Sequence, residues 1–324
     1  MKLSEEEKRV LTAVELHADL SVEDISESSG IKKNSVRYSI HKFQQNGLIR
    51  KVPFVNMYPL GFTDFVVFFS ITSKNSKSIV QSGLKKLYNS EYVTWIGELG
   101  GQYQYGMAIF VKDVAEFVQF LDTLQTYFEG ATIRKSVRIS KQFKRYNRTF
   151  FAPDMPKEVY SFGTTTTPVH IDAIDEKILL TMTKFPELSA HRQAIRANIA
   201  DATWRYRIQR LKECGVYLGD MYVIDTTMLG YTFYNIHVFT TGIRSAFEED
   251  VRTWASTHPH VVQFIECIAP WDFEIGIDVC IPQQISAIIQ EIYHVFGEHI
   301  VDIQTIPIFA HTKYTFFRPV CSKA

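Results

Sequence analysis

Cysteine is scarce in this chain of 324 residues, and the few cysteines lie far apart. All four are in the second half, at Cys214, Cys267, Cys280 and Cys321. No two have the short spacing of a zinc finger, and nothing in their arrangement indicates the disulfide framework of a small secreted protein. We therefore expect reduced thiols in a cytoplasmic protein. The Asn147-Arg148-Thr149 sequon has no meaning there, because glycosylation needs a secretory route.

Long hydrophobic runs are also missing. The longest strongly apolar stretch, Phe65 to Ile71, is far shorter than the roughly 20 residues that span a bilayer. The beginning of the chain, MKLSEEEKRVL, lacks the apolar core and the cleavage pattern of a signal peptide. We expect no membrane association and a cytoplasmic location.

An excess of one charge is absent from the chain as a whole. The 35 basic and 35 acidic residues cancel, which excludes a strongly basic nucleic-acid coat and an acidic tail protein. The halves differ, however. Residues 1–160 carry 22 Lys and Arg against 17 Asp and Glu, net +5, whereas residues 161–324 carry 13 against 18, net −5. We therefore do not expect the two halves to have identical partners.

The sequence repeats itself once. Leu20-Ser21 and Gly47-Leu48 return as Leu188-Ser189 and Gly215-Val216, both with an offset of 168 and without a gap between them. At the same offset Arg37-Tyr38 returns as Arg205-Tyr206. The period is too long for a solenoid repeat. It predicts a duplicated two-domain module, which we interpret as an internal pseudo-dimer.

Each copy begins with a helical piece. In the first copy a helix over Glu5–Leu16 precedes a second helix, for which Ser21 is the expected N-cap and Gly30 the left-handed end. A third helix is expected from about Asn34 to Gln45, and a strand from Leu48 to Val55. Three short helices with a glycine turn before the third, followed by a strand, are typical of a winged helix-turn-helix domain.

The second piece of each copy alternates between strands and helices in the order βαββαβ, which is the ferredoxin-like arrangement. The expected elements of the first copy are Phe65–Ile71, Ser76–Leu87, Tyr92–Gly97, Tyr103–Val111, Asp113–Tyr127 and Ile133–Ile139. Those of the second copy are Asn235–Thr240, Ser245–Thr257, Val261–Ile265, Phe273–Val279, Pro282–Phe296 and Val301–Pro307. The stretch from Arg145 to Pro168 has the Pro, Gly and Thr content of a linker.

The sequence thus predicts an α+β chain with two winged helix-turn-helix domains and two ferredoxin-like βαββαβ domains in tandem. The expected boundaries are 1–55 and 56–143 for the two domains of the first copy, 144–168 for the linker, and 169–224 and 225–318 for the two domains of the second copy.

The Leu-Ser start, the turn glycine, the following helix and the closing Gly-Leu, with an aromatic-x-aromatic strand start at Tyr103-Gln104-Tyr105, resemble the Lrp/AsnC (feast/famine) family of transcriptional regulators. The resemblance covers nearly the whole chain, twice. It implies that the winged domains bind double-stranded DNA. It also implies that the ferredoxin-like domain, called RAM in that family, dimerises and binds a small effector such as an amino acid. One copy per chain is usual there, so the duplication implies an intrachain pseudo-dimer and leaves a homo-oligomer open.

Three departures from the family pattern bear on function. The recognition helix of the family usually starts with Ser or Thr, where this chain has Lys32 and Ala200. The turn glycine of the first copy is replaced in the second by Asn198, which tolerates a left-handed backbone. The effector-loop glycines Gly100-Gly101 become Ala269-Pro270. We therefore expect a ligand to approach the backbone more easily in the first copy.

The candidate DNA-binding residues surround the two recognition helices. Arginine can pair with guanine and asparagine with adenine, whereas lysines contact phosphates. Asn34, Arg37, Tyr38 and His41 follow at three- and four-residue steps and should share one face, although any solvated helix face shows such a pattern. The candidates are Lys32, Lys33, Asn34, Ser35, Arg37, Tyr38, His41 and Lys42 in the first copy and Arg205, Tyr206 and Gln209 in the second.

The second recognition helix is more ambiguous than the first. Asp201 stands where the first copy has Lys33, near the expected position of the DNA phosphates. We therefore expect DNA affinity to depend mainly on the first copy.

The candidate effector-binding residues are Glu98, Gly100, Gly101 and Gln102. Backbone N–H groups at the glycines could approach an amino-acid carboxylate, and Glu98 could receive its ammonium group. The alternative is that Gly100-Gly101 simply makes a tight hairpin between two strands.

The sequence offers no pattern for catalysis, a metal or a cofactor. It contains no glycine-rich phosphate loop, and the pairs His258 with His260 and His294 with His299 lack a third ligand at a recognisable spacing. We therefore expect a protein that is not an enzyme and needs no cofactor.

Two alternatives stay open. One is an enzyme similar to the sirohaem decarboxylases, which share this architecture. The His- and Arg-rich loop that such a resemblance implies is absent from Gly100–Tyr105 and Ala269–Phe273. The other alternative is a regulator whose own DNA binding has degenerated. The sequence also leaves open the operator, the effector, the direction of regulation and the oligomeric state.

Overall fold

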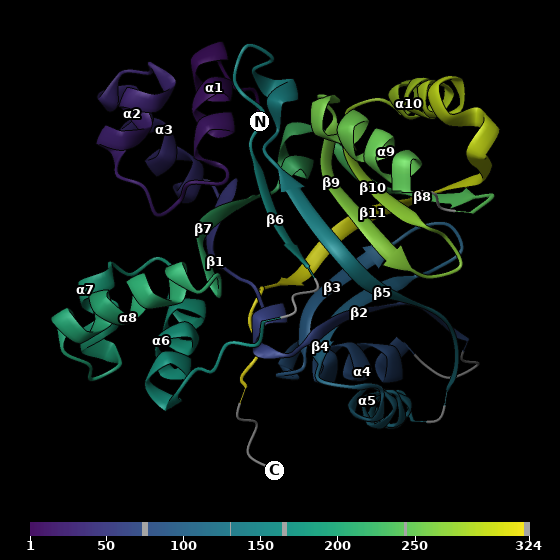
Figure 1. Ribbon diagram of the computed structural model, residues 1–324, viewed down its shortest axis with the longest axis horizontal. Coiled ribbons are helices and arrows are strands. Elements are labelled where there is room, and N and C mark those ends of the chain that lie inside the picture. The colour runs from purple at the N-terminus through teal and green to yellow at the C-terminus, as the bar shows by residue number, and fades with distance from the viewer. Residues whose placement is uncertain (73–76, 130, 164–166, 243–244, 321–324) are drawn as a thin grey trace. The chain divides into compact units, whose positions relative to one another are not determined.

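A computed structural model describes residues 1–72, 77–129, 131–163, 167–242 and 245–320; Cys321 therefore lies outside the described residues. The chain forms two compact units. Unit 1 comprises Met1–Val52, Gln142–Phe162 and Gly219–Pro307, and unit 2 comprises Pro53–Lys141, Gly163–Leu218 and Ile308–Ala324. The fold is α+β, with two winged helix-turn-helix domains and two ferredoxin-like domains, as the sequence predicts (Figure 1).

Three short helices open unit 1, namely α1 (Glu5–Val14), α2 (Val22–Ser29) and α3 (Lys33–Gln45). Ser4 and Ser21 cap the first two helices, and each takes part in a capping box that satisfies first-turn N–H groups. Gly30 ends α2 with a φ of 68°, a left-handed conformation that glycine adopts without strain. The cap at Ser21 and the end at Gly30 agree with the expectation for α2, whereas α1 ends at Val14, two residues before the expected Leu16.

The core of this first helix-turn-helix domain includes residues from far along the chain. Val10, Val36 and Phe43 are fully buried between the helices. Tyr222 and Ile224, on β7 (Tyr217–Ile224), belong to the same cluster. The strand β1 (Ile49–Val55) pairs with β7 in a two-stranded sheet, which forms the wing.

The other domain of unit 1 is the ferredoxin-like domain of the second copy. It contains β8 (Thr232–Thr240), α9 (Ser245–Thr257), β9 (Val261–Ile268), β10 (Phe273–Val279), α10 (Pro282–Phe296) and the first part of β11 (Ile300–Tyr314). β10 is antiparallel to both β8 and β9. Alternate residues such as Ile236, Phe273 and Ile275 pack against Ile288 and Ile292 of α10.

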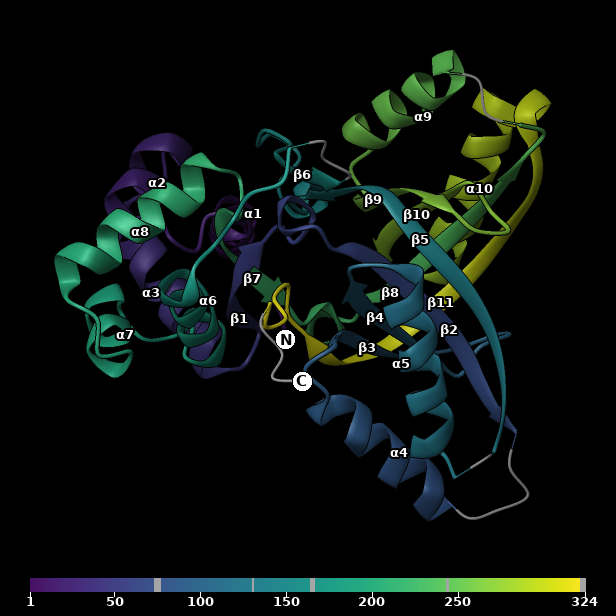
Figure 2. The same ribbon diagram turned by 60° about the horizontal axis from the view of Figure 1, so that its bottom comes forward.

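Unit 2 holds the ferredoxin-like domain of the first copy. Its elements are β2 (Thr63–Thr72), α4 (Lys77–Asn89), β3 (Val93–Leu99), β4 (Tyr105–Val111), α5 (Val114–Tyr127) and the first part of β5 (Thr132–Tyr146). β4 pairs with β2 and β3, and the last residues of β11 pair with β3. Figure 2 shows α4 and α5 beside each other next to these strands. Phe65, Val67 and Phe69 point into the core that these helices cover.

The second helix-turn-helix domain also belongs to unit 2. It consists of α6 (Ala173–Lys184), α7 (Ala190–Arg196) and α8 (Asp201–Glu213). Asn198, which replaces the turn glycine, has a φ of 52°, so it adopts the left-handed conformation expected of it. Trp204 and Leu211 of α8 are buried. Each unit thus combines the helix-turn-helix domain of one copy with the ferredoxin-like domain of the other.

Several boundaries differ from the sequence expectation. The last strand of each ferredoxin-like domain is longer than expected, since β5 runs to Tyr146 and β11 to Tyr314. The interval expected as a linker contains the short 3₁₀ helix η2 (Thr149–Phe151) and β6 (Val159–Gly163). The end of β5, from Lys141 to Tyr146, is rich in cations, so hydrophobic alternation does not reveal it as a strand.

Candidate nucleic-acid interface

The α3 helix presents one polar face to solvent. Asn34, Arg37, Tyr38 and His41 are all exposed, and Tyr38 keeps 65% of its surface accessible. The opposite face carries the buried Val36 and Phe43 described above. The exposed face thus carries one large aromatic ring among polar side chains. The spacing argument therefore gives the correct face of the helix.

Cations border the N-terminal end of this face. Lys32 is exposed, and Lys33 lies 3.7 Å from Glu23 of α2. Arg37 is 4.0 Å from the same carboxylate, and its side chain is 64% exposed. Contacts of this length between exposed groups are weak, so both cations can exchange Glu23 for another anion.

Lys42, which we expected to contact DNA, is already paired with a carboxylate of its own domain. It forms an ion pair with Glu7 of α1, a carboxylate that is mostly covered. Burial works against ionisation of Glu7, yet the hydrogen bond from Lys42 brings the pKa of Glu7 below its usual value. The contact joins α1 to α3 inside the domain. In the wing, Lys51 likewise pairs with Asp220 at 2.8 Å.

The α8 helix repeats the exposed Arg-Tyr pair of α3. Arg205 is 75% exposed in its side chain, and Tyr206 is 68% exposed. Asp201, one turn earlier, forms an ion pair with Arg205 at 2.6 Å. Gln209 is also exposed and donates a hydrogen bond to Glu213 at 3.0 Å. The second helix therefore presents the same two central side chains, with carboxylates on both sides of them.

Two further arginines of α8 turn inward. Arg207 contacts Asp172 at 2.6 Å and Asp175 at 3.2 Å, and Arg210 also pairs with Asp175. Hydrogen bonds from the Asp175 backbone and from Arg207 lower the pKa of Asp172 to about 2. These two arginines hold α8 against the start of α6. The outer face of α8 therefore presents fewer cations than the number of basic residues in the helix indicates.

The four effector candidates lie at the turn between β3 and β4. Leu99 N–H donates to Gln104 O at 2.8 Å, and Gln104 N–H donates to Phe69 O at 3.0 Å. Gly101 has a φ of 79°, and Glu98 is exposed. The turn after β9 closes in the same way, since Cys267 N–H donates to Asp272 O and Asp272 N–H to Val238 O. The same closure without glycines shows that the turn has a structural role in both copies.

Sequence reasoning missed a buried polar cluster in the second ferredoxin-like domain. The His237 ring stacks on the Trp271 ring with centroids 3.9 Å apart. Trp271 Nε1 donates to Glu274 at 3.0 Å, and Asn235 Nδ2 approaches the same carboxylate at 3.4 Å. The strand pairing that sets His237 opposite Glu274 brings these residues together. Polar residues alternating with Tyr234, Ile236 and Val238 were the only sequence signal.

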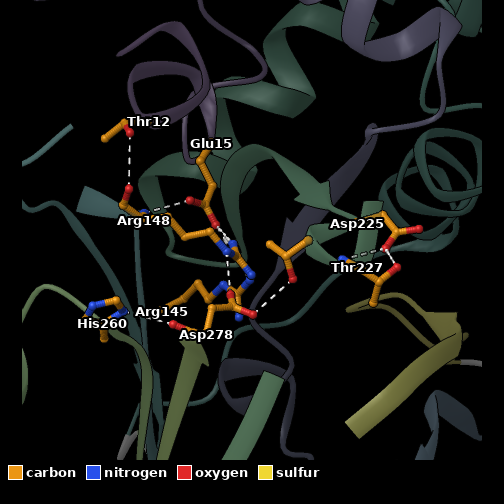
Figure 3. A network of polar contacts seen from close by, with 9 residues as sticks. Thr12, Glu15, Arg145, Arg148, Asp225, Thr227, His260 and Asp278 are labelled. Atoms are coloured by element: carbon orange, nitrogen blue, oxygen red, sulfur yellow. Dashed lines mark hydrogen bonds and ion pairs between the residues drawn. The ribbon is translucent and has the colours of Figure 1, made fainter. Parts of the chain in front are cut away.

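A second buried network joins the two domains of unit 1 (Figure 3). Arg148 lies between Glu15, which follows the last residue of α1, and Asp278 of β10, with its Nε 2.7 Å from Asp278. Its backbone N–H donates to Glu15 at 2.8 Å, and Thr226 donates to Asp278 at 3.0 Å. Burial raises the pKa of Glu15, against the attraction of Arg148. The network fixes the first helix-turn-helix domain to the second ferredoxin-like domain.

Comparison with known proteins gives similarity of fold alone. No model of a known protein family matches the chain, and no curated protein matches it either. The solved structure of the siroheme decarboxylase NirDL is 12% identical, with 97% of this chain and 94% of that chain covered and a TM-score of 0.58. The structure of NirDL in complex with an iron-uroporphyrin III analogue is also 12% identical. It covers 98% of this chain and 95% of that chain, with a TM-score of 0.57.

Solved regulators match about half of the chain. An AsnC family transcriptional regulator from Agrobacterium tumefaciens is 19% identical over 46% of this chain and 97% of that chain, with a TM-score of 0.41. A transcriptional regulator from Neisseria meningitidis in complex with L-Met is 16% identical over 45% of this chain and 94% of that chain, with a TM-score of 0.40.

Within the described ranges, no helix combines the length and apolar character needed to cross a membrane.

Proposed function

We propose that the protein is a DNA-binding transcriptional regulator that resembles the Lrp/AsnC family. The observation that carries this proposal is the exposed face of α3, where Asn34, Arg37, Tyr38 and His41 stand together on the third helix of a winged helix-turn-helix domain. Such a helix enters the major groove of DNA. The four side chains supply the hydrogen-bonding groups and the aromatic ring that contact base edges there.

Each group on this face has a suitable partner in DNA. The Arg37 guanidinium can donate two hydrogen bonds to guanine, and the Asn34 amide can pair with adenine. Lys32 and Lys33 lie at the beginning of the helix, where phosphates run beside a helix in the groove. Glu23 holds Lys33 and Arg37 only weakly, so DNA phosphates can replace it.

A selection of genomic fragments by the full chain tests this function. We expect enrichment of a small set of fragments, with binding much weaker at about 200 mM salt than at about 50 mM, because neutralised phosphates release counterions. A chain with Arg37→Ala and Tyr38→Ala is the matched control, since both side chains are exposed and removing them should leave the fold intact. Equal retention of all fragments by both chains would contradict the proposal.

For a small-molecule effector we propose the turn with Glu98, Gly100, Gly101 and Gln102. The space beside the Gly101 backbone is open, since no atom lies within 4 Å of the place where a Cβ would be. Glu98 is exposed near it in the sequence. An amino acid could place its ammonium group on Glu98. Calorimetric titration of the twenty amino acids tests this, with Glu98→Gln as a variant that keeps the hairpin. Absence of heat for every amino acid leaves the turn with its structural role only.

An enzyme acting on a sirohaem-like tetrapyrrole is the second candidate, because the fold likeness to NirDL extends over nearly the whole chain. The turns at Gly100–Tyr105 and Ala269–Phe273 supply no arginine or histidine for the substrate carboxylates. His237 lies next to the second turn but is fully buried. A shift in the absorbance spectrum of added sirohaem, with loss of carbon dioxide, would favour the enzyme; an unchanged spectrum would exclude it.

A further inference from the structure

We infer that the two recognition helices read different half-sites, so that the preferred DNA of this chain is not a palindrome. The inference rests on the proposed DNA binding and specifies its partner. It starts from the offset of 168, which aligns the exposed face of α3 with that of α8 position by position. Both faces are exposed in the structure, and each belongs to a different unit.

The centre of the two faces is the same. Arg37 corresponds to Arg205 and Tyr38 to Tyr206, and all four side chains are largely exposed. An arginine at this place can donate two hydrogen bonds to the O6 and N7 atoms of guanine. We therefore expect both half-sites to contain one G·C pair at the corresponding position.

The flanks of the two faces differ in chemistry. Asn34 corresponds to Ala202, so the amide that can pair with adenine is replaced by a methyl group that can only contact the methyl group of thymine. His41 corresponds to Gln209, one turn further along each helix. Both members of each pair are exposed. The base pairs on either side of the shared guanine should therefore differ between the half-sites.

The two arginines are also held differently. Arg205 is joined to Asp201 of its own helix at 2.6 Å, whereas Arg37 approaches Glu23 of the neighbouring helix only to 4.0 Å. A carboxylate one turn away orients the guanidinium of Arg205 and offsets its charge toward phosphates. The second helix should therefore choose its guanine strictly while adding little to overall affinity. The first helix contributes affinity through Lys33 as well as base contacts.

The test is a selection from a pool of randomised duplexes by the full chain, followed by sequencing. We expect a motif of two unequal halves that share one guanine. Asn34→Ala should relax one base pair in one half only, with a loss of about tenfold for the best duplex. Ala202→Asn should create the same base preference in the other half. Thermal unfolding of both variants checks that these exposed substitutions leave the fold intact.

The outcomes separate the inference from the proposed function. A palindromic motif, a motif with a single half-site, or an Asn34→Ala effect on both halves would overturn the inference while DNA binding stands. Failure to enrich any duplex would overturn DNA binding itself, and the inference with it. A two-part motif in which Ala202→Asn converts the second half toward the first would support it.

Discussion

At the scale of single residues, Arg148 is a buried cation whose charge is compensated by buried carboxylates. Its side chain is 3% exposed and lies between two carboxylates that are fully buried. A buried ion-pair cluster contributes little more stability than well-packed apolar residues in its place would. Removal of one member, however, leaves buried charges without compensation. The network therefore makes the junction of the two domains specific as well as stable.

We expect Arg148→Met to lower the free energy of unfolding by about 3–5 kcal/mol, because Asp278 would lose this cation and Glu15 would keep the longer ion pair with Arg145 at 3.6 Å. Urea denaturation followed by circular dichroism measures this. Lys2→Met, which removes a positive charge at an exposed position, is the control and should change stability little. Equal stability of both variants would show that the network contributes nothing.

His17 makes stability depend on pH. A hydrogen bond with Glu158 raises the pKa of His17, against its partial burial. The folded state therefore binds the proton more tightly than the unfolded state, whose histidine has a pKa of about 6.5. The resulting stabilisation is fully present below that pH and is lost as the pH rises through the folded-state pKa.

We expect the stability difference between the wild type and His17→Gln to be largest near about pH 6 and to fall toward about pH 8.5. Chemical denaturation at a series of pH values measures it. His41→Gln, at an exposed histidine, is the control. A difference that stays constant over this range would contradict the assignment.

At the scale of elements, α4 has a glycine where a helix would normally favour alanine. A Cβ on Gly83 would come within 2.3 Å of the ring of Phe128, which is fully buried. Close packing therefore outweighs helix propensity at this position.

Gly83→Ala should lower stability by about 1–3 kcal/mol despite the better helix former, because the buried ring must shift. Gly297→Ala is the matched control, since no atom lies within 4 Å of its added Cβ and its backbone is helical. Thermal or urea unfolding of both variants compares them. Stabilisation by Gly83→Ala would mean that the packing around Phe128 is loose.

The recognition helices differ most at their first residues, Lys33 on α3 and Asp201 on α8. We expect Lys33→Asp to weaken DNA binding and to lower the slope of log affinity against log salt by about 1, because one phosphate contact is lost. Asp201→Lys should strengthen binding and increase the slope. Fluorescence anisotropy over a series of salt concentrations measures both. Identical slopes for all three chains would place these positions away from the phosphates.

At the scale of the whole molecule, the two copies exchange domains. The core of the first helix-turn-helix domain contains Tyr222 and Ile224 from the second copy, and Tyr222 N–H donates to Glu15 O at 2.8 Å. The first copy therefore lacks some of the residues of its own helix-turn-helix core.

We expect residues 1–168 expressed alone to be unstable or to associate, because the apolar surface left by Tyr222 and Ile224 would be exposed. Adding residues 169–324 as a second chain should restore a compact complex. Light scattering and circular dichroism measure both states, with the full chain as reference. A stable, non-associating monomer of residues 1–168 would contradict this interdependence.

Much of the fold follows from the sequence. The limits of α9, β10 and α10 agree with the expected ranges 245–257, 273–279 and 282–296. Ser21, Gly30 and Asn198 have the roles that local chemistry predicts. These features depend on hydrophobic periodicity and on capping, which act between neighbouring residues. The long ends of β5 and β11 depend on pairing with strands that are distant in the sequence, which no local pattern records.

The sequence by itself determined the α+β class and the outward face of α3. A period of 3.6 residues fixes which side chains share a helix face. Only the tertiary structure decided which cations are engaged elsewhere, such as Lys42 with Glu7 and Arg207 with Asp172. It also decided which domains share a unit, and it brought His237 against Trp271. Those contacts join residues far apart in the chain, and no local pattern records which of many distant partners a side chain meets on folding.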